Sequence, residues 1–195
     1  MFINWRQREL NLKIVYYGPA LSGKTTNLEQ IYARTNPQRR SELLSLKTQG
    51  DRTLFFDFLQ LELGKISGLT PKIHLYTVPG QTYYEATRKL VLKDADGVVF
   101  VADSAPDRLM ANVQSWQNLK THLASYGVQQ EKFPLVVQLN KQDLVNAMTP
   151  ATLCNALSLN GHPFIPASAI GNQGVSETLK LILERVLKQI KNELT

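Results

Sequence analysis

The sequence predicts one α/β domain: a mostly parallel sheet of six strands, one of them antiparallel, with helices on both faces. Short apolar runs alternate with segments of helical periodicity along nearly the whole chain, which is typical of βαβ architecture. A length of 195 residues and a hydrophobic content of 43% suit a single large core. We therefore expect residues 1–195 to form one domain, with a short N-terminal extension over residues 1–9.

The elements follow from the period and composition of each run. Apolar runs bounded by polar or glycine residues predict strands at Leu12–Tyr17, Leu54–Leu63, Lys72–Val78, Gly97–Ala102, Leu135–Leu139 and Pro163–Ala167. The second and third runs are joined by a short connection with glycine, which predicts a hairpin and the antiparallel strand. The predicted helices are Thr25–Arg34, Tyr83–Lys93, Arg108–Tyr126, Pro150–Ala156 and Gln173–Lys191. The polar, unpatterned segment Asn36–Asp51 is interpreted as a mobile loop that responds to a ligand.

A glycine-rich stretch lies between the first predicted strand and the first predicted helix. It reads Gly-Pro-Ala-Leu-Ser-Gly-Lys-Thr and fits the phosphate-binding pattern G-x-x-x-x-G-K-[ST]. Backbone N–H groups of such a loop point at an anion, and the helix N-terminus adds to the attraction. We expect Lys24 to reach the β- and γ-phosphates and the Thr25 hydroxyl to bind Mg²⁺. The predicted phosphate-binding residues are Gly18, Pro19, Ala20, Leu21, Ser22, Gly23, Lys24, Thr25 and Thr26.

A second motif, Asn140-Lys-Gln-Asp143, closes the fifth predicted strand. The carboxylate of Asp143 can accept hydrogen bonds from both N1–H and the 2-amino group of guanine, and adenine offers no such pair of donors. Asn140, Lys141 and Asp143 are therefore predicted to bind guanine, although an ordinary polar loop is the alternative. Together the two motifs predict GTP and GDP as ligands.

Composition limits the other possibilities. The single cysteine excludes an intramolecular disulfide, and no apolar run approaches the length that spans a bilayer. Residue 2 is Phe rather than Gly, and the sequence ends without a prenylation cysteine. We expect a cytoplasmic monomer with no integral membrane segment. The net charge of +6 is interpreted as a solvated basic face with a few bases that serve the nucleotide, and a site for acidic partners, nucleic acid or anionic lipid is the alternative. The best candidate patch is the last predicted helix.

Four further stretches carry a family resemblance. They begin at Lys13 (KIVYYGP), Arg52 (RTLFFDFL), His74 (HLYTVPGQ) and Phe100 (FVADSA). Over almost its whole length the chain resembles the bacterial MglA family of Ras-like small GTPases, which governs cell polarity and motility. The resemblance implies a Ras-like P-loop GTPase fold, bound Mg²⁺, an activator with a Roadblock domain and an effector that the sequence does not identify.

The same resemblance implies roles for particular residues. Gln81, directly after Gly80, matches the glutamine that positions the attacking water, and Arg52 matches an internal arginine finger. Thr53 matches the residue that senses the γ-phosphate and Mg²⁺, so the implied metal ligands are Thr25 and Thr53. Ser168 and Ala169 match the loop that contacts guanine. Lys24, Gln81 and Arg52 are the implied catalytic residues, although Arg52 could be a solvated charge and Thr53 could simply begin a strand.

Two positions depart from the usual Ras-like pattern. Thr77 stands where most Ras-like proteins have the Asp that holds Mg²⁺ through water. MglA-type proteins resemble this chain in having Thr at this position. Asp57 is a possible substitute, or else a solvated residue of the hairpin. Ala20 stands where a glycine is usual, which predicts tight GTP binding, slow hydrolysis and a weak response to an activator. A GTP-binding module without hydrolysis and an ATP-dependent phosphotransferase remain the alternatives.

Overall fold

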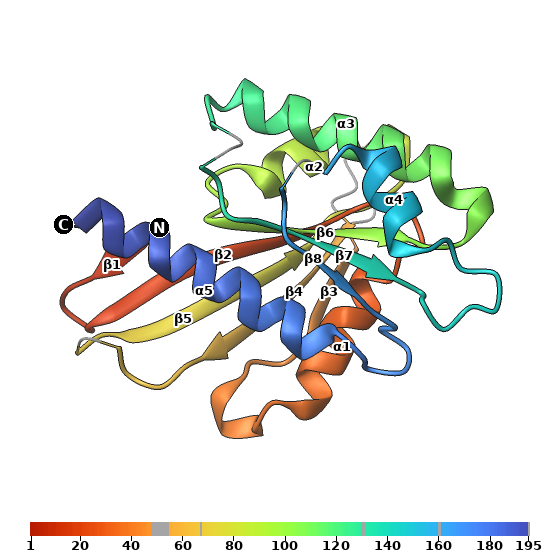
Figure 1. The fold of residues 1–195 in the computed structure, drawn as a ribbon. Helices are drawn as coiled ribbons and strands as arrows, with labels where there is room; N and C mark the ends of the chain where they lie inside the picture. Colours follow the sequence, from red (N-terminus) through yellow and green to blue (C-terminus); the bar gives the residue numbers. More distant parts are fainter. Residues whose placement is uncertain (48–54, 67, 130–131, 160, 195) are drawn as a thin grey trace.

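The computed structural model describes residues 1–47, 55–66, 68–129, 132–159 and 161–194. Within them an eight-stranded sheet runs in the order β3-β4-β5-β2-β6-β7-β8, and β1 pairs with β2 (Figure 1). The strands are β1 (Phe2–Asn4), β2 (Glu9–Tyr17), β3 (Leu44–Lys47), β4 (Phe55–Glu62), β5 (Thr70–Thr77), β6 (Gly97–Asp103), β7 (Leu135–Asn140) and β8 (Phe164–Pro166).

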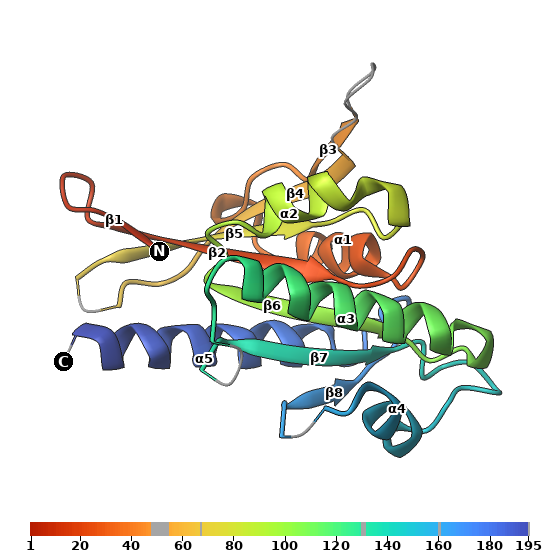
Figure 2. The ribbon, with the colours of Figure 1, turned by 90° about the horizontal axis from the view of Figure 1, so that it is seen from above.

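Helices cover both faces of the sheet, as predicted (Figure 2). They are α1 (Lys24–Arg34), α2 (Glu85–Leu92), α3 (Leu109–Ser125), α4 (Pro150–Leu157) and α5 (Val175–Leu194), with 3-10 turns η1 (Pro37–Arg39), η2 (Thr82–Tyr84) and η3 (Pro106–Arg108). Among the described residues, no helix is long and apolar enough to cross a bilayer.

The six predicted strands are present, but the strand number and the antiparallel pairing are corrected. The expected hairpin is β4–β5, and β2 pairs in parallel with both β5 and β6. The expected N-terminal extension instead contains β1, which pairs antiparallel with β2, and β2 itself begins at Glu9. The polar segment interpreted as a loop contains η1 and also β3, which pairs antiparallel with β4. The strands β1 and β3, of three and four residues, are too short to show a period, so the sequence did not predict them.

Each face of the sheet has its own apolar core. On one face, α1 and α5 contribute residues such as Leu28 and Val186 to a cluster with β2, β5 and β6. On the other face, α2, α3 and α4 contribute residues such as Val91, Trp116 and Leu153. All seven residues of β6 are buried, which explains why this central strand is a continuous apolar run.

The candidate motifs meet because they follow strands of the same direction. Gly18 follows β2, Val78 follows β5, and Ser104 follows β6. Lys141 follows β7, and Ala167 follows β8. The carboxyl ends of parallel strands lie at one edge of the sheet, where open α/β sheets bind their ligands.

Candidate nucleotide-binding site

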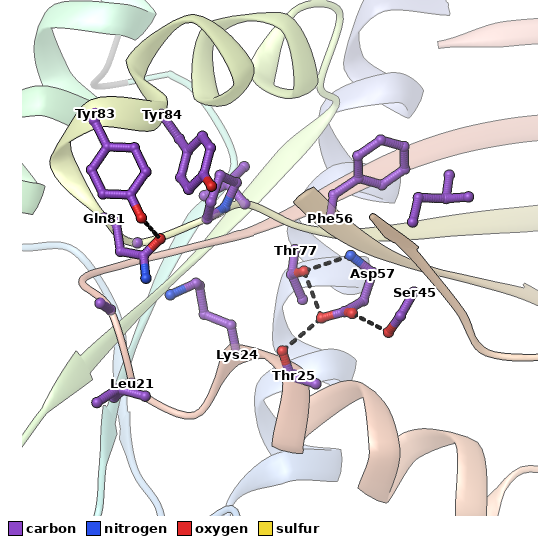
Figure 3. Close-up of a pocket in the computed structure, with 15 residues that line it drawn as sticks. Leu21, Lys24, Thr25, Ser45, Phe56, Asp57, Thr77, Gln81, Tyr83 and Tyr84 are labelled. Carbon is purple, nitrogen blue, oxygen red and sulfur yellow. Dashed lines mark hydrogen bonds between the residues drawn. The ribbon is translucent and has the colours of Figure 1, made fainter. Parts of the chain in front are cut away.

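A cavity of about 530 Å³ lies at this edge. Its walls come from the glycine-rich loop, β3, the start of β4, the end of β5 and the segment from Val78 to Tyr84 (Figure 3). Figure 3 shows Lys24 extending into the cavity, with Asp57 and Gln81 on different sides of it. Part of the predicted phosphate loop, the predicted metal ligand Thr25 and the predicted catalytic residues Lys24 and Gln81 therefore line one cavity.

The glycine-rich loop has little room for side chains at its two glycines. Gly18 has φ +151°, and a Cβ there would lie 2.3 Å from the carbonyl oxygen of Val101. Gly23 has φ +96°, and a Cβ there would lie 2.2 Å from Nδ2 of Asn140. Glycine is thus required at both positions by backbone conformation and by space.

Lys24 is a buried cation inside this loop. Its Nζ donates hydrogen bonds to the carbonyl oxygens of Pro19 at 2.6 Å and of Gly18 at 3.1 Å. Burial lowers the pKa of Lys24 to about 7, the charges of Arg88 and Arg108 act in the same direction, and Asp57 opposes them. Burial disfavours the charged form of this lysine, and its hydrogen-bond partners are neutral carbonyls. A negatively charged phosphate group would stabilise the charged form.

Asp57 accepts hydrogen bonds from three hydroxyl groups. They come from Thr25 at 2.6 Å, Ser45 at 2.6 Å and Thr77 at 2.9 Å, and the Asp57 backbone N–H in turn donates to Thr77 at 2.8 Å (Figure 3). Of the two interpretations of Asp57, the inward-facing one is therefore correct. Carboxylate and hydroxyl oxygens are the donor set that Mg²⁺ prefers, so these residues fit that ion.

Asp103 is excluded as the carboxylate of this cluster. It is fully buried at the end of β6, where it accepts hydrogen bonds from the Ala105 backbone at 3.0 Å. Lys141 Nζ lies 2.7 Å and Arg108 Nε 3.8 Å from its other oxygen. Asp103 therefore orders the loops around the second motif.

Gly80 and Gln81 lie against the glycine-rich loop. A Cβ on Gly80 would lie 2.1 Å from the backbone nitrogen of Ala20, so the two backbones are in close contact. The exposed Gln81 side chain accepts a hydrogen bond from the Tyr83 hydroxyl at 2.8 Å, and Arg88 donates to the Gln81 carbonyl. This arrangement holds the predicted water-positioning residue at the rim of the cavity.

Asn140 joins three segments that are distant in sequence. Its Nδ2 donates to the carbonyl of Ser22 at 2.7 Å, and its Oδ1 accepts from the Ala169 backbone at 2.8 Å. Ser168 and Ala169 are both buried beside it. The second motif is therefore physically tied to the glycine-rich loop and to the loop after β8.

The remaining predicted residues vary in their surroundings. Asp143 is exposed and has no hydrogen bond or ion pair within the described residues, so its carboxylate is available to a ligand. Leu21 is exposed and has φ +63°, while Thr26 is half-buried in the first turn of α1. Arg52 and Thr53 lie outside the described residues.

Sequence reasoning missed two residues at this edge. Ser45 belongs to the segment interpreted as an unpatterned loop, and no sequence signal marked it. Arg108 was predicted only as the start of a helix, yet its Nη2 donates to the Ala20 carbonyl at 2.8 Å. The two residues are 88 positions apart, so only the fold brings them together.

The fold and this site define the protein as a small GTPase, a Ras-like guanine-nucleotide-binding switch protein. The profile of the ADP-ribosylation factor family matches residues 1–192, and the chain belongs to that family. The expected Ras-like fold and guanine-nucleotide ligand are thereby confirmed.

The chain is also similar to individual curated proteins. It is 52% identical over 190 residues to the mutual gliding-motility protein MglA of Myxococcus xanthus, covering 97% of each chain. It is 29% identical over 191 residues to ADP-ribosylation factor-like protein 6 of Caenorhabditis briggsae, covering 94% of this chain and 87% of the relative. It is 28% identical over 193 residues to human ADP-ribosylation factor-like protein 4C, covering 93% and 90%. The resemblance to MglA is thus confirmed over nearly the full length.

Proposed function

We propose that the protein is a slow, Mg²⁺-dependent GTPase switch that requires an activator for rapid turnover. The observation that carries this proposal is Asn140, whose side chain ties the predicted guanine-binding motif to the phosphate-binding loop. The base and the phosphates of one nucleotide would then be bound by two loops that the Asn140 side chain connects.

In this mechanism water attacks the γ-phosphate and Gln81 positions it. Lys24 binds the phosphate oxygens, and Arg52 neutralises the charge that develops on them. When Mg²⁺ is bound, Thr25 and Thr53 would hold it, and the Asp57 carboxylate would take the part of the Asp that Thr77 replaces. The ion would supply charge neutralisation to the phosphates.

Two contacts in this structure indicate which segments would move when GTP and Mg²⁺ bind. Gly80 touches the backbone of Ala20, and Asp57 takes up the hydroxyl of Thr25. A γ-phosphate and a metal ion would compete for both contacts, so their arrival favours displacement of the Gly80 segment and of Asp57. Loss of the γ-phosphate on hydrolysis would restore these contacts, which is how a switch reports its nucleotide.

The cellular setting is also part of the proposal. The similarity to a gliding-motility protein supports a role in cell polarity or motility. We place the protein in the cytoplasm, where GTP is available, as a monomer that binds a Roadblock-domain activator and a separate effector. These partners rest on the family resemblance.

Ala20 is the reason to expect slow hydrolysis. It lies at the contact with Gly80 and lines the cavity together with Gln81. Its methyl group would leave ground-state binding nearly intact but would crowd the region where Gln81 must act, and a displacement near 1 Å can lower a rate on the order of a hundredfold.

Single-turnover GTP hydrolysis tests the proposal. We expect slow release of phosphate by the unmodified protein, only weak acceleration by a Roadblock-domain activator, and faster hydrolysis by Ala20→Gly in both conditions. Gln81→Leu is the matched control and should bind GTP without hydrolysing it. GTP binding with no hydrolysis in any of these proteins, even with the activator, would favour the alternative of a GTP-binding module without hydrolysis. Equal rates for the unmodified protein and Ala20→Gly would refute the role of the methyl group.

A further inference from the structure

Exposed aromatic side chains and cations gather at the end of the molecule farthest from the nucleotide site. At the β1–β2 hairpin, Phe2 is 65% and Trp5 74% exposed. Arg6 and Arg8 follow Trp5 in the same turn and are exposed as well. A tryptophan beside arginines is typical of surfaces that enter the polar boundary of a bilayer.

A basic pocket lies near the same end. Its volume is about 440 Å³, and it is lined by Lys132, Pro134, Arg185, Lys188, Gln189 and Asn192. Three cations, Lys132, Arg185 and Lys188, around one hollow fit the negative charge of a phosphate group.

The tertiary structure brings these two features together. The β1–β2 hairpin and the C-terminal end of α5 lie at the same end of the molecule in both Figure 1 and Figure 2. Ile3 of β1 packs against the same core cluster to which α5 contributes Ile190.

Two carboxylates near the hairpin, Glu9 and Asp96, already have partners of opposite charge. Glu9 forms an ion pair with Lys72 at 2.6 Å, and Asp96 pairs with the N-terminal amine and accepts the backbone N–H of Lys13. They therefore offset little of the positive charge from Arg6, Arg8 and the pocket.

We propose that this end of the protein docks on a bilayer that contains anionic phospholipids. Phosphodiester headgroups occupy the pocket of Lys132, Arg185 and Lys188, while Trp5 and Phe2 enter the interfacial layer. Charge complementarity identifies the occupant, because the pocket is cationic and the hairpin adds amphipathic aromatic rings. In this orientation the nucleotide edge faces away from the membrane, where the Gly80 segment stays accessible to partners. The proposal is independent of the hydrolysis mechanism.

Co-sedimentation with vesicles is the direct test. The probes are phosphatidylcholine vesicles and vesicles of phosphatidylcholine with an equal part of phosphatidylglycerol. We expect binding to the anionic vesicles alone, weakened by raising the salt from ~0.1 M to ~0.5 M. The double variant Arg185→Ala with Lys188→Ala should lower the partition coefficient roughly tenfold or more. The control pair Lys180→Ala with Arg39→Ala removes the same charge elsewhere and should lower it much less.

Tryptophan emission gives a second readout from the protein itself. Trp5 is exposed and Trp116 is 3% exposed, so a blue shift on adding anionic vesicles reports Trp5. We expect the shift to vanish in Trp5→Phe while GTP hydrolysis in solution is unchanged in every variant.

Three outcomes would overturn the proposal. They are no binding to anionic vesicles, equal loss in the two double variants, and no shift of Trp5 emission on binding. If the pocket variants instead abolish binding of duplex DNA or an acidic polypeptide while vesicles fail to bind, the surface serves another polyanion and the proposal is wrong. Circular dichroism of each variant excludes unfolding as the cause.

Discussion

Lys24 couples nucleotide binding to a proton. In the free protein burial lowers its pKa to about 7, so above that pH the side chain loses its charge. In the unfolded chain Lys24 keeps its proton up to the ordinary lysine pKa of 10.5. Between about pH 7 and this value the unfolded chain therefore binds more protons than the folded protein. The free energy of unfolding of the nucleotide-free protein should therefore rise with pH above about 7.

We expect a bound phosphate to reverse this shift. Its negative charge raises the pKa of Lys24, so GDP binding at pH ~8 should take up a proton, and affinity should fall as pH rises above about 7. Isothermal titration calorimetry in buffers of low and high ionisation enthalpy measures the uptake. Lys24→Arg keeps its charge throughout and should show none. Identical heats in both buffers for the unmodified protein would contradict the coupling.

Asp143 should determine the choice of base. Its exposed carboxylate has no described partner, so it is free to accept the two donors of guanine. Asp143→Asn places an amide donor against N1–H, and we expect GTP affinity to fall by about 1–3 kcal/mol while xanthosine triphosphate gains. Direct titration of both nucleotides checks this. Asp107→Asn, an exposed carboxylate on η3, is the control, and an unchanged GTP affinity in Asp143→Asn would remove the assignment.

At the scale of elements, β3 and β4 deliver the acidic group that Thr77 does not supply. Ser45 of β3 and Asp57 of β4 are opposite each other in the antiparallel pair, and their side chains share a hydrogen bond of 2.6 Å. The neighbouring pairing with β5 places Thr77 2.9 Å from the same carboxylate. The position of Asp57 is thus set by strand register.

We expect Asp57→Asn to weaken Mg²⁺ binding to the nucleotide complex by about tenfold or more, because an amide brings no charge to a water that the ion holds. Nucleotide affinity measured in EDTA should change little. Mg²⁺ titration of nucleotide release gives both values, and Ser45→Ala should have the smaller effect. A Mg²⁺ dependence in Asp57→Asn that equals that of the unmodified protein would exclude this role.

At the scale of the whole molecule, α5 packs tightly against the centre of the sheet at Gly97. A Cβ on Gly97 would lie 2.7 Å from Cγ2 of Val186 and 3.1 Å from Cδ1 of Ile182. Both of these side chains are buried on α5, so neither can move into solvent. The contact between this helix and the centre of the sheet depends on the absence of a side chain.

Gly97→Ala should lower the free energy of unfolding by about 1–3 kcal/mol through overpacking. Gly64→Ala is the matched control, since a Cβ there meets nothing within 4 Å, and its effect should be near zero or slightly stabilising. Urea unfolding followed by circular dichroism measures both. The double variant Gly97→Ala with Val186→Ala should cost less than the sum of the two single changes. Additive losses would show that the predicted clash is absent.

The sequence by itself determined the βαβ order, the six strands other than β1 and β3, and the two nucleotide motifs. These features are local: Gly18 and Gly23 are needed by the backbone of one loop, and the period of each run reflects which face it buries. The motif Asn140–Asp143 could be recognised because its four residues are consecutive in the sequence, at the end of a predicted strand.

Only the tertiary structure decided which distant side chains complete the site. The pairing of β3 with β4 turns Asp57 toward Thr25, and the placement of α3 brings Arg108 to the Ala20 carbonyl. The basic pocket likewise joins Lys132 to Arg185 of α5, although no block of like charges marks it in the sequence. Such contacts depend on the order and register of the strands, which no short stretch of sequence encodes.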